Sequence, residues 1–430
     1  MIRLDAAHLS FEADFAALVD ARRESDADVA RDVTAILRAV REEGDTALRA
    51  YTQKLDRHDL DATGWSIPAS DCAAAFAALA PELREALELA ASRIRAYHEK
   101  QRPDDLAFTD DAGVRLGARW RAVDAAGVYV PGGRAAYPST LLMNAIPAKV
   151  AGVERLVVVT PTPDGAVNPL VLAAAHLAGA DEVWRVGGAQ AIAALAWGTD
   201  RIAPVDVVTG PGNAWVAEAK RQVYGVVGID MVAGPSEIVV IADGANDAEW
   251  IAADLLSQAE HDVTTQSILF TDDAGFADRV ADAVERQLAG LATGETARVA
   301  WEANGAIILV PDLADACALT DRLAPEHVEI ATDDPHALFS KLRHAGSAFL
   351  GRHTPEAIGD YVAGPNHVLP TGRRARFASG LSVTDFMKRT SFLQLDATAL
   401  GKLGPATVAL ATAEGLPAHA ASVALRLAKG

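Results

Sequence analysis

Two long stretches of the chain repeat one pattern, in which a short apolar run is followed by a helical segment. The first covers about residues 130–235 and contains the runs RLVVVT, DEVWRV and VDVVTG. The second covers about residues 236–350 and contains EIVVIAD, QSILFT, GAIILV and HVEIAT. These runs hardly alternate between apolar and polar residues, which is typical of parallel strands covered on both faces. The sequence therefore predicts an α/β fold with two Rossmann-like units and mainly parallel sheets.

Helical patterns flank the two units. Residues 12–100 carry apolar residues at spacings of three and four, which predicts helices. Residues 351–384 break the rhythm with a stretch rich in Gly, Pro and Arg, and such a long loop in an enzyme is usually functional or a linker. The tail from residue 385 reads as helical again. It has little core of its own, so we expect it to pack on the body or on another subunit.

Charge and composition exclude several classes of protein. The net charge is −19, and this acidity argues against a nucleic-acid partner, because nucleic-acid binding depends on Lys and Arg at phosphates. No apolar run approaches the length of a membrane helix, and the first residues lack the apolar segment of a signal peptide. Cys72 and Cys317 lie in amphipathic helical patterns and are expected to be buried and unreactive. We expect a cytoplasmic protein.

Glycine-rich turns follow several of the predicted strands. They are VYVPGGRAAYP, VGGAQA, VTGPGNAW and VAGPSE. Ligands of open α/β sheets bind beyond the carboxyl ends of the strands, and the N-terminus of a following helix favours anions. The chain lacks a GxGxxG motif with a trailing acid, so a nucleotide would be bound differently from the standard dinucleotide fold.

Polar residues suited to chemistry occur in the second half of the chain. Gln258 and His261 share a helix face in DLLSQAEHD, where both could bind a divalent metal or a substrate. Glu326 and His327 precede a predicted strand, and an acid beside an imidazole is a plausible general acid/base pair. Further candidates are Asp360, His367, Glu414 and His419. Each of these also has an ordinary structural explanation, and sequence spacing alone does not bring them together.

Taken together, eight motifs of the chain resemble the histidinol dehydrogenase family. They are AGVYVPGGRAAYPST, VGGAQAIAALAWGT, VDVVTGPGNAWVAEAKR, AGPSEIVVIAD, DLLSQAEHD, RLAPEHVEI, YVAGPNHVLPT and EGLPAHAASV. They follow the family order and cover the chain from about residue 30 to its end. The resemblance implies a zinc- and NAD-dependent enzyme that oxidises L-histidinol to L-histidine, the last two steps of histidine biosynthesis.

The resemblance also implies roles for single residues. The ligands of one zinc ion per subunit would be Gln258, His261, Asp360 and His419. The acid/base pair would be Glu326 and His327. Substrate contacts would come from Ser236 and Glu414, together with His327 and the four ligand residues. NAD contacts would come from Tyr129, Gln190 and Asn213, and His367 would support the pocket.

A division into domains follows from the same resemblance. Residues 1–25 would form a helical N-terminal segment, and residues 26–129 with 237–381 a first α/β domain carrying the metal and acid/base residues. Residues 130–236 would form an inserted α/β domain with the NAD-binding turns. Residues 382–430 would form a helical tail that completes the site of the other subunit in a homodimer.

The chemistry agrees with this set of residues. Oxidation of an alcohol to a carboxylate removes four electrons, so one turnover needs two NAD molecules. His327 is expected to take the alcohol proton, and Glu326 to activate the water that hydrates the aldehyde. Neither cysteine lies in a site motif, so we expect the aldehyde to be oxidised as its hydrate and not as a thiohemiacetal of a cysteine. Zinc would hold the imidazole and amine nitrogens of the substrate.

Three other functions remain open at this point. A related NAD-dependent dehydrogenase could act on another small alcohol, although Glu414 and His419 favour a substrate with an amine and an imidazole. A zinc hydrolase could use Glu326 as its base, but it would leave the glycine-rich turns without a purpose. A non-catalytic binding protein would not need an acid/base pair beside a metal site.

Overall fold

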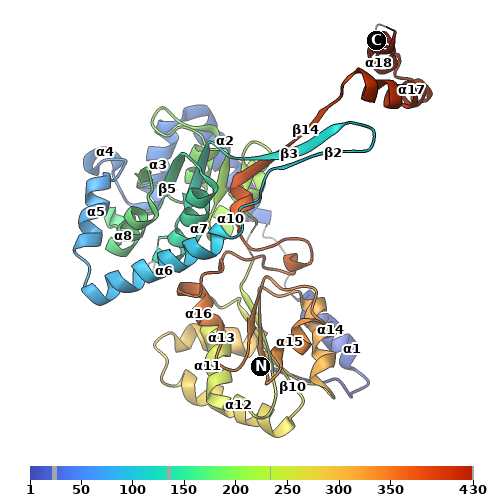
Figure 1. The fold of residues 1–430 in the computed structure, drawn as a ribbon. Coiled ribbons are helices and arrows are strands. Elements are labelled where there is room, and N and C mark those ends of the chain that lie inside the picture. Colours follow the sequence, from blue (N-terminus) through green and yellow to red (C-terminus); the bar gives the residue numbers. More distant parts are fainter. Residues whose placement is uncertain (22–26, 133–136, 233, 429–430) are drawn as a thin grey trace.

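Two parallel sheets form the body of the molecule (Figure 1). The computed structural model describes residues 1–21, 27–132, 137–232 and 234–428. The larger sheet has the order β1-β11-β10-β9-β12-β13, with bounds Ile2–Asp5, Ala306–Leu309, Gln266–Thr271, Glu237–Ala242, His327–Ala331 and Ser347–Leu350. The smaller sheet has the order β6-β5-β4-β7-β8, with bounds Glu182–Trp184, Arg155–Val159, Ala125–Tyr129, Val207–Thr209 and Gly228–Ile229. The two predicted α/β units are confirmed.

Apart from β1, which is added at one edge of the larger sheet, both sheets share one strand topology. In the smaller sheet β4 is the first strand along the chain and lies between β5 and β7; in the larger sheet β9 lies in the same way between β10 and β12. The strand order therefore reverses beside β4 and beside β9. Ligand crevices are expected outside the carboxyl ends of the strands at such a reversal.

Helices cover both faces of the smaller sheet because its strands are apolar on both sides. One face packs on α2 (Ala27–Glu43), α3 (Asp45–Asp56), α9 (Gly188–Trp197) and α10 (Ala214–Val223). The other face packs on α6 (Pro81–Glu99), α7 (Pro138–Ala151) and α8 (Pro169–Ala178), with α5 (Ala69–Ala77) beside α8. The expected division grouped residues 26–129 with the larger unit. In the structure their helices lie on the smaller sheet instead, since their apolar stripes pack against it.

The larger sheet is covered in the same manner. Helices α11 (Ala248–Ala259), α12 (Ala274–Leu288) and α13 (Gly294–Asn304) pack on one face, and α1 (Phe11–Asp20) and α14 (Leu313–Leu323) on the other. The first strand, β1, extends this sheet beside β11, although the sequence predicted only helix for the N-terminal segment. Among the residues that the structure describes, no helix combines the length and apolarity needed to cross a membrane.

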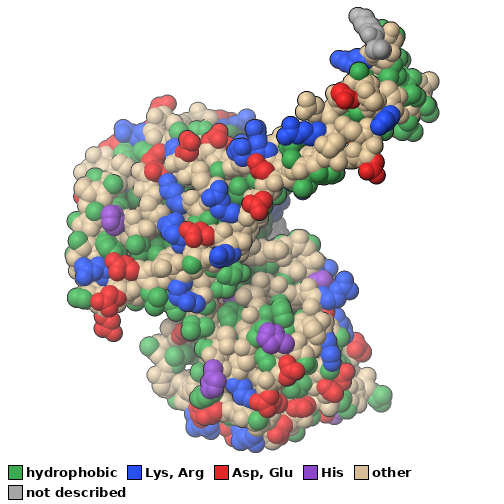
Figure 2. All heavy atoms as spheres, in the orientation of Figure 1, with side chains coloured by type: hydrophobic (Ala, Val, Ile, Leu, Met, Phe, Trp, Pro, Cys, Tyr) green, Lys and Arg blue, Asp and Glu red, His purple; other side chains and the backbone are tan. Residues whose placement is uncertain are grey.

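An antiparallel ribbon projects from the body and carries the C-terminal helices (Figure 1). It consists of β2 (Leu106–Thr109), β3 (Arg115–Ala122) and β14 (Met387–Gln394), and it ends in α17 (Ala397–Ala413) and α18 (Pro417–Leu427). Residues 387–394 were expected to be helical but form a strand, because β3 offers them an edge to pair with. Figure 2 shows hydrophobic side chains on these tail helices, and Leu410 and Leu425 are each about two-thirds exposed.

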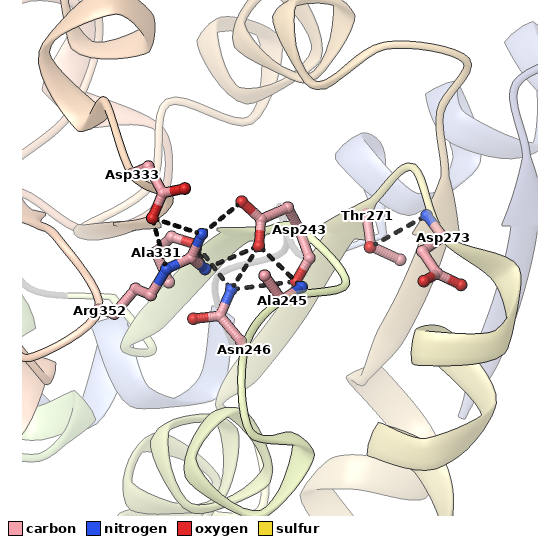
Figure 3. Close-up of polar contacts among 8 residues, drawn as sticks. All are labelled: Asp243, Ala245, Asn246, Thr271, Asp273, Ala331, Asp333 and Arg352. Atoms are coloured by element: carbon pink, nitrogen blue, oxygen red, sulfur yellow. Dashed lines mark hydrogen bonds and ion pairs between the residues drawn. The ribbon is translucent and has the colours of Figure 1, made fainter.

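A network of ion pairs occupies the carboxyl edge of the larger sheet, where its strand order reverses (Figure 3). Arg352 makes two hydrogen bonds of 2.7 Å to Asp243, which follows β9. It also bonds to Asp333, which follows β12, and to the carbonyl of Ala331, the last residue of β12. The amide of Asn246 also donates to the Ala331 carbonyl. The ion pairs of Arg352 therefore span the crevice at this edge of the larger sheet.

Candidate active site

A cavity of about 400 Å³ is lined by residues of both units. From the smaller sheet come the loops that follow the carboxyl ends of β4 and β7. From the larger sheet come residues at the amino ends of β9 and β12, with the end of α11 and the short helix α16 (Glu356–Tyr361). The cavity brings together eight residues predicted from the sequence, namely Asn213, Ser236, Gln258, His261, Glu326, His327, Asp360 and His367.

Glu326 is a buried carboxyl at the start of β12. Its side chain Oε2 accepts a hydrogen bond of 3.2 Å from the backbone N–H of Glu237, and Ser236 also hydrogen-bonds to it. Burial raises the pKa of the Glu326 carboxyl well above its usual value. A carboxyl of this kind holds or releases a proton closer to neutral pH than an exposed one does.

His327 has a tautomer that is fixed by its neighbours. Its Nδ1 lies 3.2 Å from the Glu237 backbone oxygen and 3.0 Å from Oε1 of Gln258. Both neighbours are acceptors, so Nδ1 carries the hydrogen and Nε2 keeps its lone pair. Nε2 is buried without a hydrogen-bond partner. Burial lowers the pKa of the His327 imidazole to about 4, which keeps the ring neutral.

Three predicted metal ligands lie around the same cavity. Gln258 belongs to the last turn of α11, and its Nε2 lies 3.3 Å from Nδ1 of His261, which follows the helix. Asp360 lies on α16, where Nδ1 of His367 donates to its backbone oxygen at 3.0 Å. Burial is the largest single influence and raises the pKa of the Asp360 carboxyl, but the hydrogen bond from His367 and the charges of His367, His327 and His261 together outweigh it and leave the pKa below its usual value.

Glu356, which was not predicted from the sequence, also lies at this site. Its Oε1 lies 3.5 Å from Nε2 of His327, and one ligand atom each of His327, Glu356 and Asp360 falls within 4.8 Å of the others. Burial raises the pKa of the Glu356 carboxyl to about 8. The sequence feature that could have identified Glu356 is its spacing of four residues from Asp360, which puts both carboxylates on one face of a helix.

Glu414 and His419 do not reach this cavity within one chain. Both are exposed and lie at the joint between α17 and α18, beyond the end of the ribbon (Figure 1). The body of one chain therefore brings together three of the four predicted zinc ligands.

A second cavity of about 630 Å³ adjoins the smaller sheet and contains the three predicted NAD contacts. The hydroxyl of Tyr129 accepts a hydrogen bond of 3.2 Å from the Gly188 amide at the start of α9, and burial raises the Tyr129 pKa to about 12. Gln190 is buried in the first turn of that helix, and its Oε1 has no hydrogen-bond partner. Asn213 caps α10 and lines both cavities.

A buried ion pair, also missed by sequence analysis, supports the turn between the two cavities. The ammonium of Lys220 pairs with Oδ1 of Asp230 and donates to the Gly210 carbonyl at 2.8 Å. Oδ2 of Asp230 accepts a hydrogen bond of 2.8 Å from the Gly210 amide. The turn at Gly210 is therefore bound on both its backbone groups, and its φ of +112° lies in the region that favours glycine.

Comparisons with known proteins give one consistent result. The family model described as histidinol dehydrogenase matches residues 19–427. The histidinol dehydrogenase of Zymomonas mobilis is 63% identical over 429 residues, covering 100% of both chains, and that of Rhodospirillum rubrum is 61% identical over 430 residues, covering 100% of this chain and 99% of the relative. The crystal structure of histidinol dehydrogenase from Elizabethkingia anophelis superposes with a TM-score of 0.95 at 35% identity, covering 100% of this chain and 98% of that one.

Proposed function

The chain belongs to the histidinol dehydrogenase family, and from this membership we propose that it oxidises L-histidinol to L-histidine with NAD, the last two steps of histidine biosynthesis. One observation carries the assignment to this site. The acid/base pair Glu326–His327 and the donors Gln258, His261 and Asp360 line a single cavity, beside a second cavity large enough for much of a dinucleotide.

His327 is the proposed base for the alcohol. Its Nδ1 hydrogen is held by the Glu237 carbonyl, so Nε2 is the atom that accepts the substrate's hydroxyl proton. Glu326 is the proposed base for the water that hydrates the aldehyde. Its neighbours Ser236 and the Glu237 amide hold the carboxyl in place and leave it facing the cavity.

The donors present fit a zinc ion. Gln258, His261 and Asp360 offer an amide oxygen, an imidazole nitrogen and a carboxylate oxygen, and zinc accepts nitrogen and oxygen ligands of these kinds. The Nε2 atoms of His327 and His367 are buried and make no hydrogen bond, which also indicates a cavity made for a polar occupant. When bound, zinc would supply a Lewis-acidic centre for the imidazole and amine nitrogens of the substrate. Three protein donors from one chain leave room for the fourth ligand, His419.

The second cavity is the proposed site of NAD. It lies where the strand order of the smaller sheet reverses, between the loops after β4 and β7. The N-termini of α9 and α10 open into it and offer backbone N–H groups to a pyrophosphate. Asn213 lines both cavities, so the nicotinamide end can reach the acid/base pair while the rest of the cofactor lies in the second cavity.

A second copy of the chain is the proposed source of Glu414 and His419. The ribbon carries these residues away from their own body, and the tail helices expose Leu410 and Leu425. Apolar helix faces of this kind need a partner surface. A homodimer in which each tail completes the site of the other subunit would cover them and supply the fourth zinc ligand.

An absorbance assay with histidinol and NAD tests the reaction. We expect two NADH per histidinol, and we expect a chelator to abolish both the reaction and the tight binding of histidinol measured by calorimetry. Histidinol affinity that survives removal of zinc would contradict the role given to the metal.

Mixed dimers test the exchange of tails. Glu326→Gln inactivates the body of a subunit, whereas His419→Ala inactivates its tail. Unfolded and refolded together, the two variants should recover about a quarter of wild-type activity, since half of the dimers are mixed and each mixed dimer has one intact site. Absence of recovery would place the tail in the site of its own chain.

A further inference from the structure

Asp56 is a buried carboxyl that the proposed reaction does not use. It is the last residue of α3, lines the second cavity and is 9% exposed. Its Oδ2 is buried and has no hydrogen-bond partner. Burial raises the pKa of the Asp56 carboxyl to about 6, with Arg57 acting against it. A buried acceptor without a donor is costly, so an aspartate kept in this position indicates a ligand that supplies the donor.

The position of Asp56 in the cavity identifies the part of the cofactor that would meet it. The nicotinamide end must lie toward the acid/base pair, on the side where Asn213 borders the first cavity. Asp56 lines the second cavity and not the first. The same part of the lining includes Ile36 of α2 and Tyr51 and Leu55 of α3. Leu55 is half exposed. These side chains offer apolar surface to an adenine ring, which places the adenosine ribose next to Asp56.

The charges around this end of the cavity favour hydroxyls over a phosphate. Asp32 and Asp56 contribute two carboxyls, and Lys54 is the cation among the described residues that line the cavity. The adjacent Arg57 directs its guanidinium to Asp164, with Nε 2.7 Å from Oδ1. A second negative group near a buried carboxylate is repelled, whereas a ribose diol donates hydrogen bonds to it.

We infer that the Asp56 carboxylate accepts hydrogen bonds from the adenosine ribose hydroxyls and selects NAD over its 2′-phosphorylated counterpart. The inference rests on the proposed function, because it takes the second cavity as the cofactor site. It adds a residue that determines cofactor specificity to the three contacts expected from the sequence. Dinucleotide-binding folds of the standard type place an acidic residue on the same hydroxyls, but there the acid follows a GxGxxG turn, and here it ends a helix from another part of the chain.

The test compares Asp56→Asn with the wild-type enzyme in steady-state oxidation of histidinol. Asparagine keeps the size of the side chain and removes its charge. We expect the KM for NAD to rise about tenfold or more, which is the usual effect of losing a hydrogen bond to a charged group. We expect the preference for NAD over NADP, as a ratio of kcat/KM values, to fall about tenfold or more. The kcat at saturating NAD and the KM for histidinol should change little.

Two controls separate the possible outcomes. Glu43→Gln removes a charge from the exposed end of α2, away from the cavity lining, and should leave the NAD preference unchanged. Direct binding of NAD and NADP to each variant, measured by calorimetry, gives the same comparison without turnover. A wild-type protein that reduces no NAD with histidinol would refute the proposed function. An active wild type together with an unchanged preference in Asp56→Asn, by turnover and by binding, would overturn the role of Asp56 alone.

Discussion

The buried pair of Lys220 and Asp230 gives the sharpest test of how the body supports the site. The two side chains are 2% and 1% exposed, and together they hold both backbone groups of Gly210. We consider Lys220→Met, which keeps the length of the side chain and removes its charge. The Asp230 carboxylate then stays buried with the Gly210 and Met231 amides as its remaining hydrogen-bond donors.

The expected cost follows from that unpaired charge. Removal of one partner of a buried ion pair typically costs ~3–5 kcal/mol of unfolding free energy, because the remaining charge is left in a low-dielectric environment. The double variant Lys220→Met/Asp230→Asn has no buried charge and keeps an acceptor for the Gly210 amide. It should be more stable than the single variant by about 2 kcal/mol. Lys149→Met is the matched control: its pair with Asp181 is partly exposed, at 21% and 44%, and should cost less than about 1 kcal/mol.

Urea unfolding followed by circular dichroism, at one fixed protein concentration, measures these free energies. The KM for NAD measures whether the turn at Gly210 keeps its position beside the cofactor site. We expect this KM to rise more in Lys220→Met than in Lys149→Met. A Lys220→Met variant as stable as the wild type would refute the reasoning. So would a double variant less stable than the single one, since the Asp230 carboxylate would then be stabilised by the Gly210 and Met231 amides alone and would not be a costly unpaired charge.

Three further predictions concern other parts of the structure. A methyl group added at Gly210 would lie 2.1 Å from a backbone oxygen of β4, so Gly210→Ala should raise the KM for NAD severalfold; Gly225→Ala, also at positive φ but with no atom within 4 Å, should leave it unchanged in the same assay. Arg352→Met removes the bridge to Asp243 at the edge away from the site, so urea titration should show a loss of ~2–3 kcal/mol with an unaltered kcat, and a fall in kcat would show that the network acts on catalysis. Asp56 has a folded pKa of about 6 against an ordinary 3.8, so the unfolded chain releases its proton first and the stability of the cofactor-free protein should fall by up to about 3 kcal/mol as pH rises from about 4 to 6. Asp56→Asn should lack this fall, and equal pH profiles of the two proteins would contradict the assigned pKa.

The sequence was informative wherever one segment decides its own structure. The apolar runs of residues 155–160 and 237–243 predicted buried parallel strands. A strand covered on both faces is apolar along its whole length, so its own sequence is enough to identify it. The pair Gln258–His261 was predicted to share a helix face; the structure places both on the cavity, although the helix ends at Ala259 and His261 lies in the turn after it.

The remaining features depend on contacts between distant segments. Residues 387–394 form a strand because β3 lies beside them, and their own pattern gave no such indication. Lys220, Asp230 and Asp56 are ordinary charged residues in helical or loop sequence, and only their burial makes them unusual. The packing of residues 27–99 on the smaller sheet likewise follows from which apolar faces meet in the fold.

The ribbon that carries the tail has a consequence for the order in which the molecule is made. Met387 pairs with Ala122 and Gln394 with Arg115, so every pairing of β14 with β3 joins residues more than 260 positions apart. During synthesis β3 leaves the ribosome long before β14, so the edge of β3 that pairs with β14 stays unpaired while both α/β units can already fold. The ribbon can reach its final orientation only after β14, the last strand, has been synthesised. A nascent or truncated chain would then have a finished body and an unpaired β-edge, which is the surface on which chaperones act and aggregation begins.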